Sequence, residues 1–298
     1  MPAAGLLLLD KPVGLSSNAA LQRVRRLAGR IKAGHCGSLD PLAEGMLPIC
    51  LGEATRLAGE LLEGRKQYRF GLLLGERSAT GDAEGEIIER APVPELTAAA
   101  IEGALQRFRG PQSQIPPMYS ALKRDGQPLY RLARAGVTVE RQPRSLLIDE
   151  LSLLGWDGPE LELRVLCSKG TYVRVLAEDI ARALGSCGRL TRLRRDYVEP
   201  FASEPLVSMA QLEATPASDW PLLSADRAVG HLPLLRLDSA QAEALRCGRQ
   251  IALPQLAATP ADAARWRLYD PQGRFLGLGC SAAATLRVQR LFSAPLTV

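Results

Sequence analysis

The sequence is poor in the residue types that metal and cofactor sites most often use. It has only two histidines and six cysteines, and no two cysteines form a Cys-x-x-Cys pair. Structural zinc sites draw on cysteine and histidine at short spacings, so we expect no metal. Neither a P-loop nor a Gly-x-Gly-x-x-Gly stretch occurs, and these are the common phosphate-cradling motifs of nucleotide-dependent enzymes. We therefore expect no cofactor.

Long apolar runs are also missing. The opening stretch, Met1 to Asp10, holds a run of only four leucines and no basic residue. A signal peptide or a membrane span needs a longer apolar segment. We expect the six cysteines to be reduced thiols, as is usual in cytosolic proteins. We therefore expect a cytoplasmic protein that does not enter a membrane, and we expect it to be a monomer.

The composition that remains is that of a globular protein with an anionic partner. Of the 298 residues, 46% are hydrophobic and 23% are charged, which suits one large or two ordinary domains. The formal net charge is +5, and the sequence pI is about 9.0. This balance favours a partner such as nucleic acid, although solvated basic surfaces are common without one.

Periodicity and turn residues predict strands and helices in a mixed order. We expect strands at 5–10, 46–51, 68–74, 145–156, 161–168 and 189–198, and helices at 18–29, 53–62, 96–108 and 171–184. The stretch 109–144 is rich in proline, glycine and basic residues, and we expect a long surface loop there. From about residue 234, a short helix at 239–246 and a hairpin around Asp270-Pro271-Gln272-Gly273 predict a small β-rich module.

The most informative stretch is Gly34-His-Cys-Gly-Ser-Leu-Asp-Pro-Leu-Ala-Glu-Gly-Met-Leu-Pro48. Its three glycines and two prolines predict a loop. Pro41 restricts the residue before it to extended or turn conformations, so Asp40 carries a short and rigidly posed carboxylate. Asp40 is also the first acid after a segment, from Lys11 to Leu39, that holds six basic residues and no acidic one. A lone Asp-Pro is usually a simple turn, but the surrounding pattern favours a functional loop.

That pattern resembles the catalytic loop of the TruB family of tRNA pseudouridine synthases. Four other stretches of the sequence resemble motifs of the same family in the same order: Asp10-Lys-Pro-Val-Gly-Leu-Ser-Ser17, Lys66-Gln-Tyr-Arg69, Ile115-Pro-Pro-Met-Tyr-Ser-Ala-Leu-Lys123 and Cys167-Ser-Lys-Gly-Thr-Tyr-Val-Arg174. The likeness covers about residues 5–200 and is weaker afterwards.

The resemblance implies an architecture. We expect an α+β fold, with a mixed, largely antiparallel central sheet and flanking helices. Residues 1–230 would form the catalytic domain, with an RNA-clamping insertion at about 109–144. Residues 234–298 would form a small β-rich, PUA-like RNA-binding domain.

The resemblance also implies a reaction: the uridine at position 55, in the TΨC arm of tRNA, is isomerised to pseudouridine without a cofactor. The bond from the base to the sugar breaks, and a bond from C5 to C1′ forms. Asp40 would be the catalytic nucleophile. Attack on C1′, attack on C6 and removal of a sugar proton to give a glycal all remain open at this point.

The family's other site residues map onto five positions. Arg174 would pair with Asp40, because burial under a base disfavours a charged carboxylate unless a cation lies nearby. Tyr68 would stack on the flipped base, Tyr172 would bond near the base or Asp40, and Leu193 would line the pocket. His35 would fill the space that the base leaves in the RNA.

Two other classes of function are compatible with parts of the sequence. A non-catalytic RNA-binding protein or tRNA-folding chaperone would explain the basic charge and the C-terminal module, but not the Asp40 loop. A hydrolase would need a second carboxylate beside Asp40, either Asp82 or Glu44. Asp82 lies in a stretch that matches the family only in part, so we assign it no catalytic role. Glu44 stands where Thr or Ser is usual.

Overall fold

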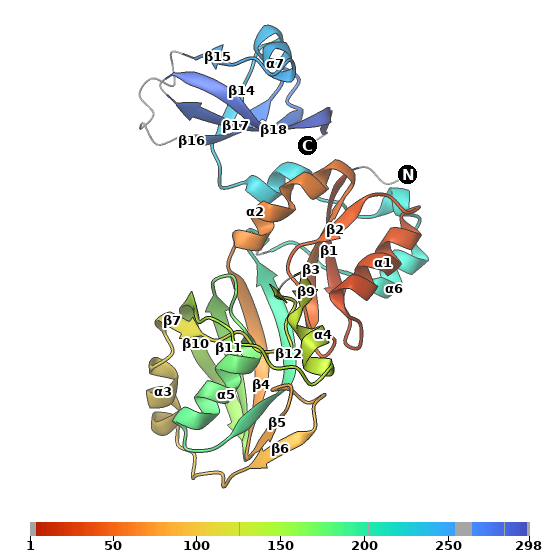
Figure 1. The fold of residues 1–298 in the computed structure, drawn as a ribbon. Helices are drawn as coiled ribbons and strands as arrows, with labels where there is room; N and C mark the ends of the chain where they lie inside the picture. The colour runs from red at the N-terminus through yellow and green to blue at the C-terminus, as the bar shows by residue number, and fades with distance from the viewer. Residues whose placement is uncertain (1–3, 125, 202, 254–263, 283, 297–298) are drawn as a thin grey trace.

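The computed structural model describes residues 4–124, 126–201, 203–253, 264–282 and 284–296. Residues 254–263, 283 and 297–298 of the predicted C-terminal module therefore lie outside the described residues. A large sheet with flanking helices forms the main body, and a small β-domain with one helix lies at one end (Figure 1). The predicted α+β class is confirmed.

The central sheet contains nine strands within the described residues. Their order is β13-β1-β3-β12-β4-β11-β10-β7, and β2 pairs with β3 outside this path. The β1–β13 and β3–β12 pairs are parallel, and the other pairs are antiparallel, as predicted. The strands are β1 Gly5–Lys11, β2 Ala33–His35, β3 Glu44–Leu51, β4 Lys66–Leu74, β7 Gly110–Gln114, β10 Arg144–Asp157, β11 Glu160–Cys167, β12 Gly188–Val198 and β13 Val207–Ser208.

Strand β1 explains why a run of leucines begins the sheet. Leu7 and Leu9 face one hydrophobic core, whereas Leu6 and Leu8 face a second core on the other side of the sheet. A strand that is covered on both faces reads as a continuous apolar run instead of an alternating one. The Asp40 loop joins β2 to β3, and β3 is the neighbour of β1 in the sheet.

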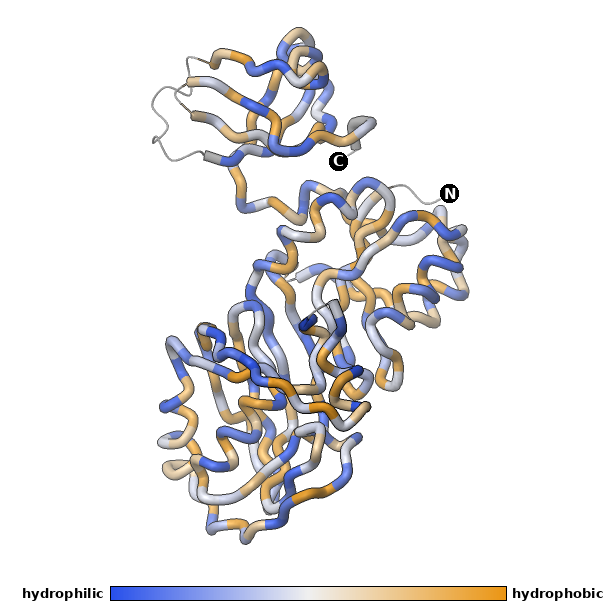
Figure 2. Tube along the Cα trace, viewed as in Figure 1, coloured by the Kyte–Doolittle hydropathy of each residue, from blue (hydrophilic) through white to orange (hydrophobic). Residues whose placement is uncertain are grey.

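Helices cover both faces of this part of the sheet. Helices α1 Ser17–Leu27, α3 Ala98–Gln106, α5 Val173–Ala183 and α6 Met209–Ala214 contribute to the first core. The second core is shared by the 3-10 helices η1 Gly52–Leu57 and η3 Ala225–Val229 and by α2 Ala58–Glu63; η2 Ala217–Asp219 lies between α6 and η3. Figure 2 shows hydrophobic and hydrophilic stretches alternating along α1. None of the helices in the described part of the chain combines the length and the apolar character needed to cross a bilayer.

The stretch 109–144 differs from the predicted long loop. Its first part is strand β7, which pairs with β10 at the edge of the central sheet. The remainder contains the short hairpin of β8 Lys123–Arg124 and β9 Gln127–Pro128, followed by helix α4 Leu129–Arg134. Strand β7 has the sequence GPQSQ, which shows no apolar alternation, so its conformation depends on pairing with β10, a strand distant in the sequence. A separate hairpin, β5 Glu76–Ser78 with β6 Ile87–Arg90, lies nearby.

The C-terminal module contains the predicted helix and hairpin. Helix α7 spans Ser239–Arg246, and β16 Ala264–Tyr269 pairs with β17 Phe275–Ala282. The sheet order is β14-β16-β17-β18-β15, where β14 is Leu234–Arg236, β15 is Ile251–Ala252 and β18 is Thr285–Leu296.

The C-terminal module packs firmly against the main body. The Phe275 and Phe292 side chains belong to the second core, together with Leu6 of β1. The Arg265 guanidinium also bonds both carboxylate oxygens of Glu60 on α2, at 3.0 and 2.6 Å. Apolar burial and a bidentate ion pair both join the two parts.

Candidate active site

The Asp40 carboxylate lies on a loop that is tied to the rest of the main body. The Ser17 hydroxyl donates to the Leu39 carbonyl at 3.0 Å and accepts from the Leu39 amide at 2.7 Å. On the other side of Asp40, the Gly14 amide donates to the Pro41 carbonyl at 2.8 Å. Bonds directly before and after Asp40 restrict its backbone. The N-terminal motif that contains Gly14 and Ser17 therefore positions Asp40.

Arg174 is the partner of Asp40 and connects three segments of the chain. Its Nε donates to Asp40 Oδ2 at 2.9 Å, Nη1 donates to the Thr80 carbonyl at 2.9 Å, and Nη2 donates to the Tyr119 carbonyl at 2.7 Å. The Arg174 side chain is 6% exposed, whereas the Asp40 side chain is 41% exposed. A buried cation thus orients a carboxylate whose other side stays accessible. Such a carboxylate can approach a substrate without losing its counter-charge.

Asp82 is a second partner of Arg174. Its Oδ2 lies 3.8 Å from Arg174 Nε, and its side chain is 5% exposed. The other oxygen, Oδ1, accepts from the Thr80 hydroxyl at 2.5 Å and from the Glu84 amide at 3.1 Å. The sequence analysis assigns Asp82 no catalytic role, because its surroundings match the family pattern only in part. Its burial and its bonds favour a role in holding Arg174.

Tyr68 and Leu193 lie on neighbouring strands of the sheet. Leu193 on β12 pairs with Phe70 on β4, and Tyr68 pairs with Arg195 two positions along. The Tyr68 and Leu193 side chains both belong to the first core, and each keeps less than a tenth of its surface exposed. Burial raises the pKa of the Tyr68 hydroxyl, and the neighbouring Arg195 opposes this rise.

Tyr172 directly precedes α5, two residues before Arg174. Its backbone bonds the Gln114 side chain on β7 twice: Tyr172 N donates to Gln114 Oε1 at 3.0 Å, and Gln114 Nε2 donates to the Tyr172 carbonyl at 3.4 Å. Burial raises the pKa of the Tyr172 hydroxyl. The edge strand β7, which the sequence did not predict, therefore fixes the start of the helix that carries Arg174.

His35 lies at the end of β2, at the entrance to the Asp40 loop. Its side chain is half-buried, and Nδ1 is enclosed without a hydrogen-bond partner in the described part of the chain. Burial lowers the pKa of His35, and Arg195 lowers it further. A neutral imidazole at this place is compatible with stacking against a nucleobase.

Besides Arg174, three further buried cations lie near the site in the described part of the chain. Lys11, Lys66 and Arg195 are 0%, 6% and 1% exposed. The Lys11 ammonium donates to the Pro12 and Leu15 carbonyls, at 2.8 and 2.6 Å. Burial lowers the pKa of both lysines to about 8. The sequence alone gave no sign that these side chains are buried, because isolated basic residues are most often solvated.

Glu44 belongs to an ion-pair group that does not include Asp40. Its Oε1 lies 3.6 Å from Arg194 Nη1, and Arg194 also pairs with Asp10 at 3.1 Å and Asp196 at 3.3 Å. Glu44 is therefore engaged by an arginine on β12. This pairing gives a structural reason for a carboxylate where the family usually has Thr or Ser.

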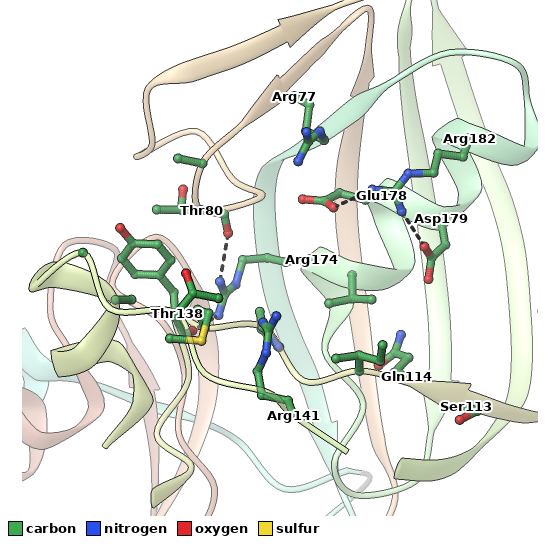
Figure 3. Close-up of a pocket in the computed structure, with 18 residues that line it drawn as sticks. Arg77, Thr80, Ser113, Gln114, Thr138, Arg141, Arg174, Glu178, Asp179 and Arg182 are labelled. Carbon is green, nitrogen blue, oxygen red and sulfur yellow. Dashed lines mark hydrogen bonds and ion pairs between the residues drawn. The ribbon is translucent and has the colours of Figure 1, made fainter. Parts of the chain in front are cut away.

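A cavity of about 760 Å³ lies beside Arg174, between α5 and the segment that follows β7. Figure 3 shows the Arg141 side chain pointing into it toward Arg174. Arg77 and Arg182 also line it, as do two carboxylates, so that arginines outnumber acids. Apolar contacts come from Ile115, Pro117 and Met118. The combination suits a polyanion that carries flat bases. Among the described residues, no group of three or more His, Cys, Asp or Glu is arranged to hold a metal ion.

Comparisons with known proteins give matches over most of the chain. The family profile described as TruB family pseudouridylate synthase (N terminal domain) matches residues 25–173, and that of the pseudouridine synthase II TruB C-terminal domain matches residues 233–292. A tRNA pseudouridine synthase B of Burkholderia lata is 52% identical over 96% of this chain and 89% of its own length. One from Aromatoleum aromaticum is 51% identical over 97% of this chain and 92% of its own length.

Solved structures show the same fold in more distant proteins. A chain in the crystal structure of a Cbf5-Nop10-Gar1 complex superposes with a TM-score of 0.74 at 22% identity, and the match covers 96% of this chain and 84% of that one. A chain in the structure of an H/ACA RNP bound to a substrate RNA containing 2'-deoxyuridine gives the same TM-score at 20% identity, over 97% and 85% of the two chains.

Proposed function

Because this chain belongs to the TruB family and is a tRNA pseudouridine synthase, we propose that it modifies the uridine at position 55 in the TΨC arm of tRNA and that Asp40 is its nucleophile. The observation that carries the proposal is the asymmetry of the Asp40–Arg174 pair. The carboxylate is accessible, and its cation is buried. Isomerisation needs one such group and neither oxidant nor hydrolytic water, because uridine and pseudouridine have the same composition.

The base must leave the RNA stack to reach Asp40, at a cost of a few kcal/mol. Stacking on Tyr68 would return roughly 1–3 kcal/mol of this cost, and Leu193 would contact the base from the neighbouring strand. The Tyr172 side chain would form a hydrogen bond near the base or Asp40. His35, at the entrance to the loop, would occupy the space that the base leaves in the RNA.

After the sugar–base bond breaks and C5 bonds C1′, C5 carries one proton too many. Tyr68 is the group that we assign to its removal. Its hydroxyl is buried next to a cation, and a phenol in that setting can exchange a proton with carbon more easily than one in a neutral core.

Binding of the rest of the RNA would involve three basic regions. The exposed Arg26 and Arg30 lie at the end of α1, Lys123 and Arg124 lie on the hairpin after β7, and the third region is the C-terminal module at 234–298. The predicted clamp at 109–144 is thereby reduced to about 115–143, because β7 belongs to the sheet. Lys and Arg contacts to phosphates supply the salt-sensitive part of affinity for nucleic acids.

The proposal is tested by incubating the protein with transcribed tRNA that carries uridine tritiated at C5. We expect tritium release to equal the pseudouridine formed, and we expect no release above background from a control transcript with cytidine at position 55. Release from the control at the rate of the natural tRNA would show that the target lies elsewhere.

A further inference from the structure

Arg195 is the most deeply buried arginine of the described residues, and the established reaction assigns it nothing. Its Nε donates to the Met46 carbonyl at 2.7 Å and its Nη2 to the Gly37 carbonyl at 3.1 Å. In the part of the chain that the structure describes, Arg195 forms no ion pair with a carboxylate. In the described part of the chain, its charge is thus compensated by backbone carbonyls without a carboxylate partner.

This charge is costly where it lies. A buried ion without an opposite charge loses several kcal/mol of solvation, and Arg195 also lowers the pKa of three neighbouring groups, Lys11, Lys66 and His35. A neutral donor could satisfy the same carbonyls. The positive charge must therefore contribute something besides packing.

The side chain that faces Arg195 is Tyr68. The two residues are direct partners across the antiparallel β4–β12 pair, so their side chains project from the same face of the sheet. A register shift follows at once, between Arg195 and Tyr197, and such an irregularity re-aims the neighbouring side chains. Both side chains are more than nine-tenths buried. Inside this low-dielectric region, a cation acts strongly on a phenol.

We propose that Arg195 is a positioning residue for Tyr68: its guanidinium holds the Tyr68 hydroxyl and stabilises the phenolate that accepts the C5 proton. This inference rests on the proposed function. In the step itself, the C5–H bond breaks and its proton forms the new O–H bond of Tyr68. The electron pair forms the C5–C6 double bond of pseudouracil, the C6–N1 double bond opens so that its pair moves onto N1, and N1 takes a proton from solvent. Tyr68 returns its proton to solvent before the next cycle.

Several other charged or titratable groups lie near Tyr68 and Arg195. Asp40 and the Cys167 thiol oppose ionisation of Tyr68, whereas Arg195 favours it. Lys11, Lys66 and His35 are the cationic or titratable neighbours of Arg195 on β1, β4 and β2. Arg195 is thus the charge in this group that favours the phenolate when the C5 proton leaves.

The test compares Arg195→Met, which loses the charge, with Arg195→Lys, which keeps it. Arg189→Met is the matched control, because Arg189 lies on the same strand and pairs with Glu76 instead. Tritium release under single-turnover conditions is measured from pH 6 to 9, with tRNA binding alongside. We expect Arg195→Met to bind tRNA, to lose about 100-fold in rate and to move its rate profile to higher pH. Arg195→Lys should lose less, and the control should lose nothing.

A second arm replaces Tyr68 by 3-fluorotyrosine, whose phenol ionises more readily. It should restore part of the rate of Arg195→Met at neutral pH. If Arg195→Met fails to fold, the fluorotyrosine arm is run in Arg195→Lys, where the same rescue is expected. An unchanged rate profile in the folded Met variant, or no rescue by fluorotyrosine, would overturn the inference.

The outcomes separate this inference from the proposed function. If the unmodified protein forms no pseudouridine at position 55, the proposed function fails first. If it does, and Tyr68→Phe abolishes tritium release while the Arg195 variants behave like the control, only the role of Arg195 is wrong.

Discussion

Replacing Arg174 should separate folding from catalysis at this site. The guanidinium makes three contacts shorter than 3 Å, to Asp40 and to the carbonyls of Thr80 and Tyr119, and it lies 3.8 Å from Asp82. A methionine fills most of the same volume but provides no charge and no donor. Arg174→Met therefore leaves one accessible and one buried carboxylate without their cation.

The two carboxylates should contribute very differently to stability. Asp40 is 41% exposed, so water screens its pair, which is worth about 0–1 kcal/mol. Asp82 is 5% exposed, and breaking a buried pair from one side costs about 3–5 kcal/mol. Two donors still bond Asp82 Oδ1, which favours the lower end, about 3 kcal/mol. Adding Asp82→Asn removes the uncompensated charge and should recover at least about 1 kcal/mol.

Urea unfolding and single-turnover pseudouridine formation measure the two effects. We expect the double variant to regain stability but to stay at least about 100-fold slower than the unmodified protein, because Asp40 still lacks the group that orients it. Arg182→Met is the stability control: it lies on the same helix, is 56% exposed, and should change stability by less than about 1 kcal/mol. If the double variant regained activity together with stability, Arg174 would serve only to fold the site.

Three further predictions follow from the same geometry. Tyr68→Phe should bind tRNA normally but release little tritium from C5, and normal release would show that the hydroxyl is not needed. Gly45→Ala should destabilise the fold by several kcal/mol, because Gly45 has φ +98° and a Cβ there would lie 2.3 Å from the Arg195 carbonyl. Gly59→Ala, in helix α2, meets nothing within 4 Å and should not destabilise the fold, because Ala favours a helix over Gly by up to about 1 kcal/mol. Burial lowers the pKa of Lys11 to about 8 from 10.5, so between these pH values the unfolded chain binds more protons than the folded one. This lysine should therefore add roughly 3 kcal/mol to the free energy of unfolding as pH rises from 8 to 10.5. Lys11→Met should remove that rise, and a Met variant whose free energy of urea unfolding still rose with pH as in the unmodified protein would contradict the prediction.

The strands and helices with clear periodicity could be predicted because local pattern and burial coincide. The leucines of β1 and the apolar face of α5 are examples. Strand β7 could not, because Gly110-Pro-Gln-Ser-Gln114 is polar and is extended only through pairing with β10. Its misassignment also hid the contact between Gln114 and Tyr172, which positions the start of α5.

Within the site, the residues that lie in recognisable motifs could be predicted. The residues whose part depends on being buried in the fold could not. The pairing of Asp40 with Arg174 was expected from two motifs, and the structure places the two side chains 2.9 Å apart. Arg195 lies in the strand predicted at 189–198, but alternation along a strand gives no means of recognising a buried cation that bonds backbone carbonyls. Asp82 was set aside on its incomplete motif, and only the fold reveals that it shares Arg174 with Asp40.

The most direct test of the account is the amount of pseudouridine that Asp40→Asn forms at position 55 in a single turnover. Asparagine preserves the size of the side chain and suits the same turn before Pro41, while it removes the nucleophile. We expect no product after the unmodified protein has converted all of its bound tRNA, with binding at least as tight as before because one negative charge near the phosphates is gone. Product formed at the unmodified rate by a folded Asp40→Asn protein would contradict the assignment of Asp40 as the nucleophile.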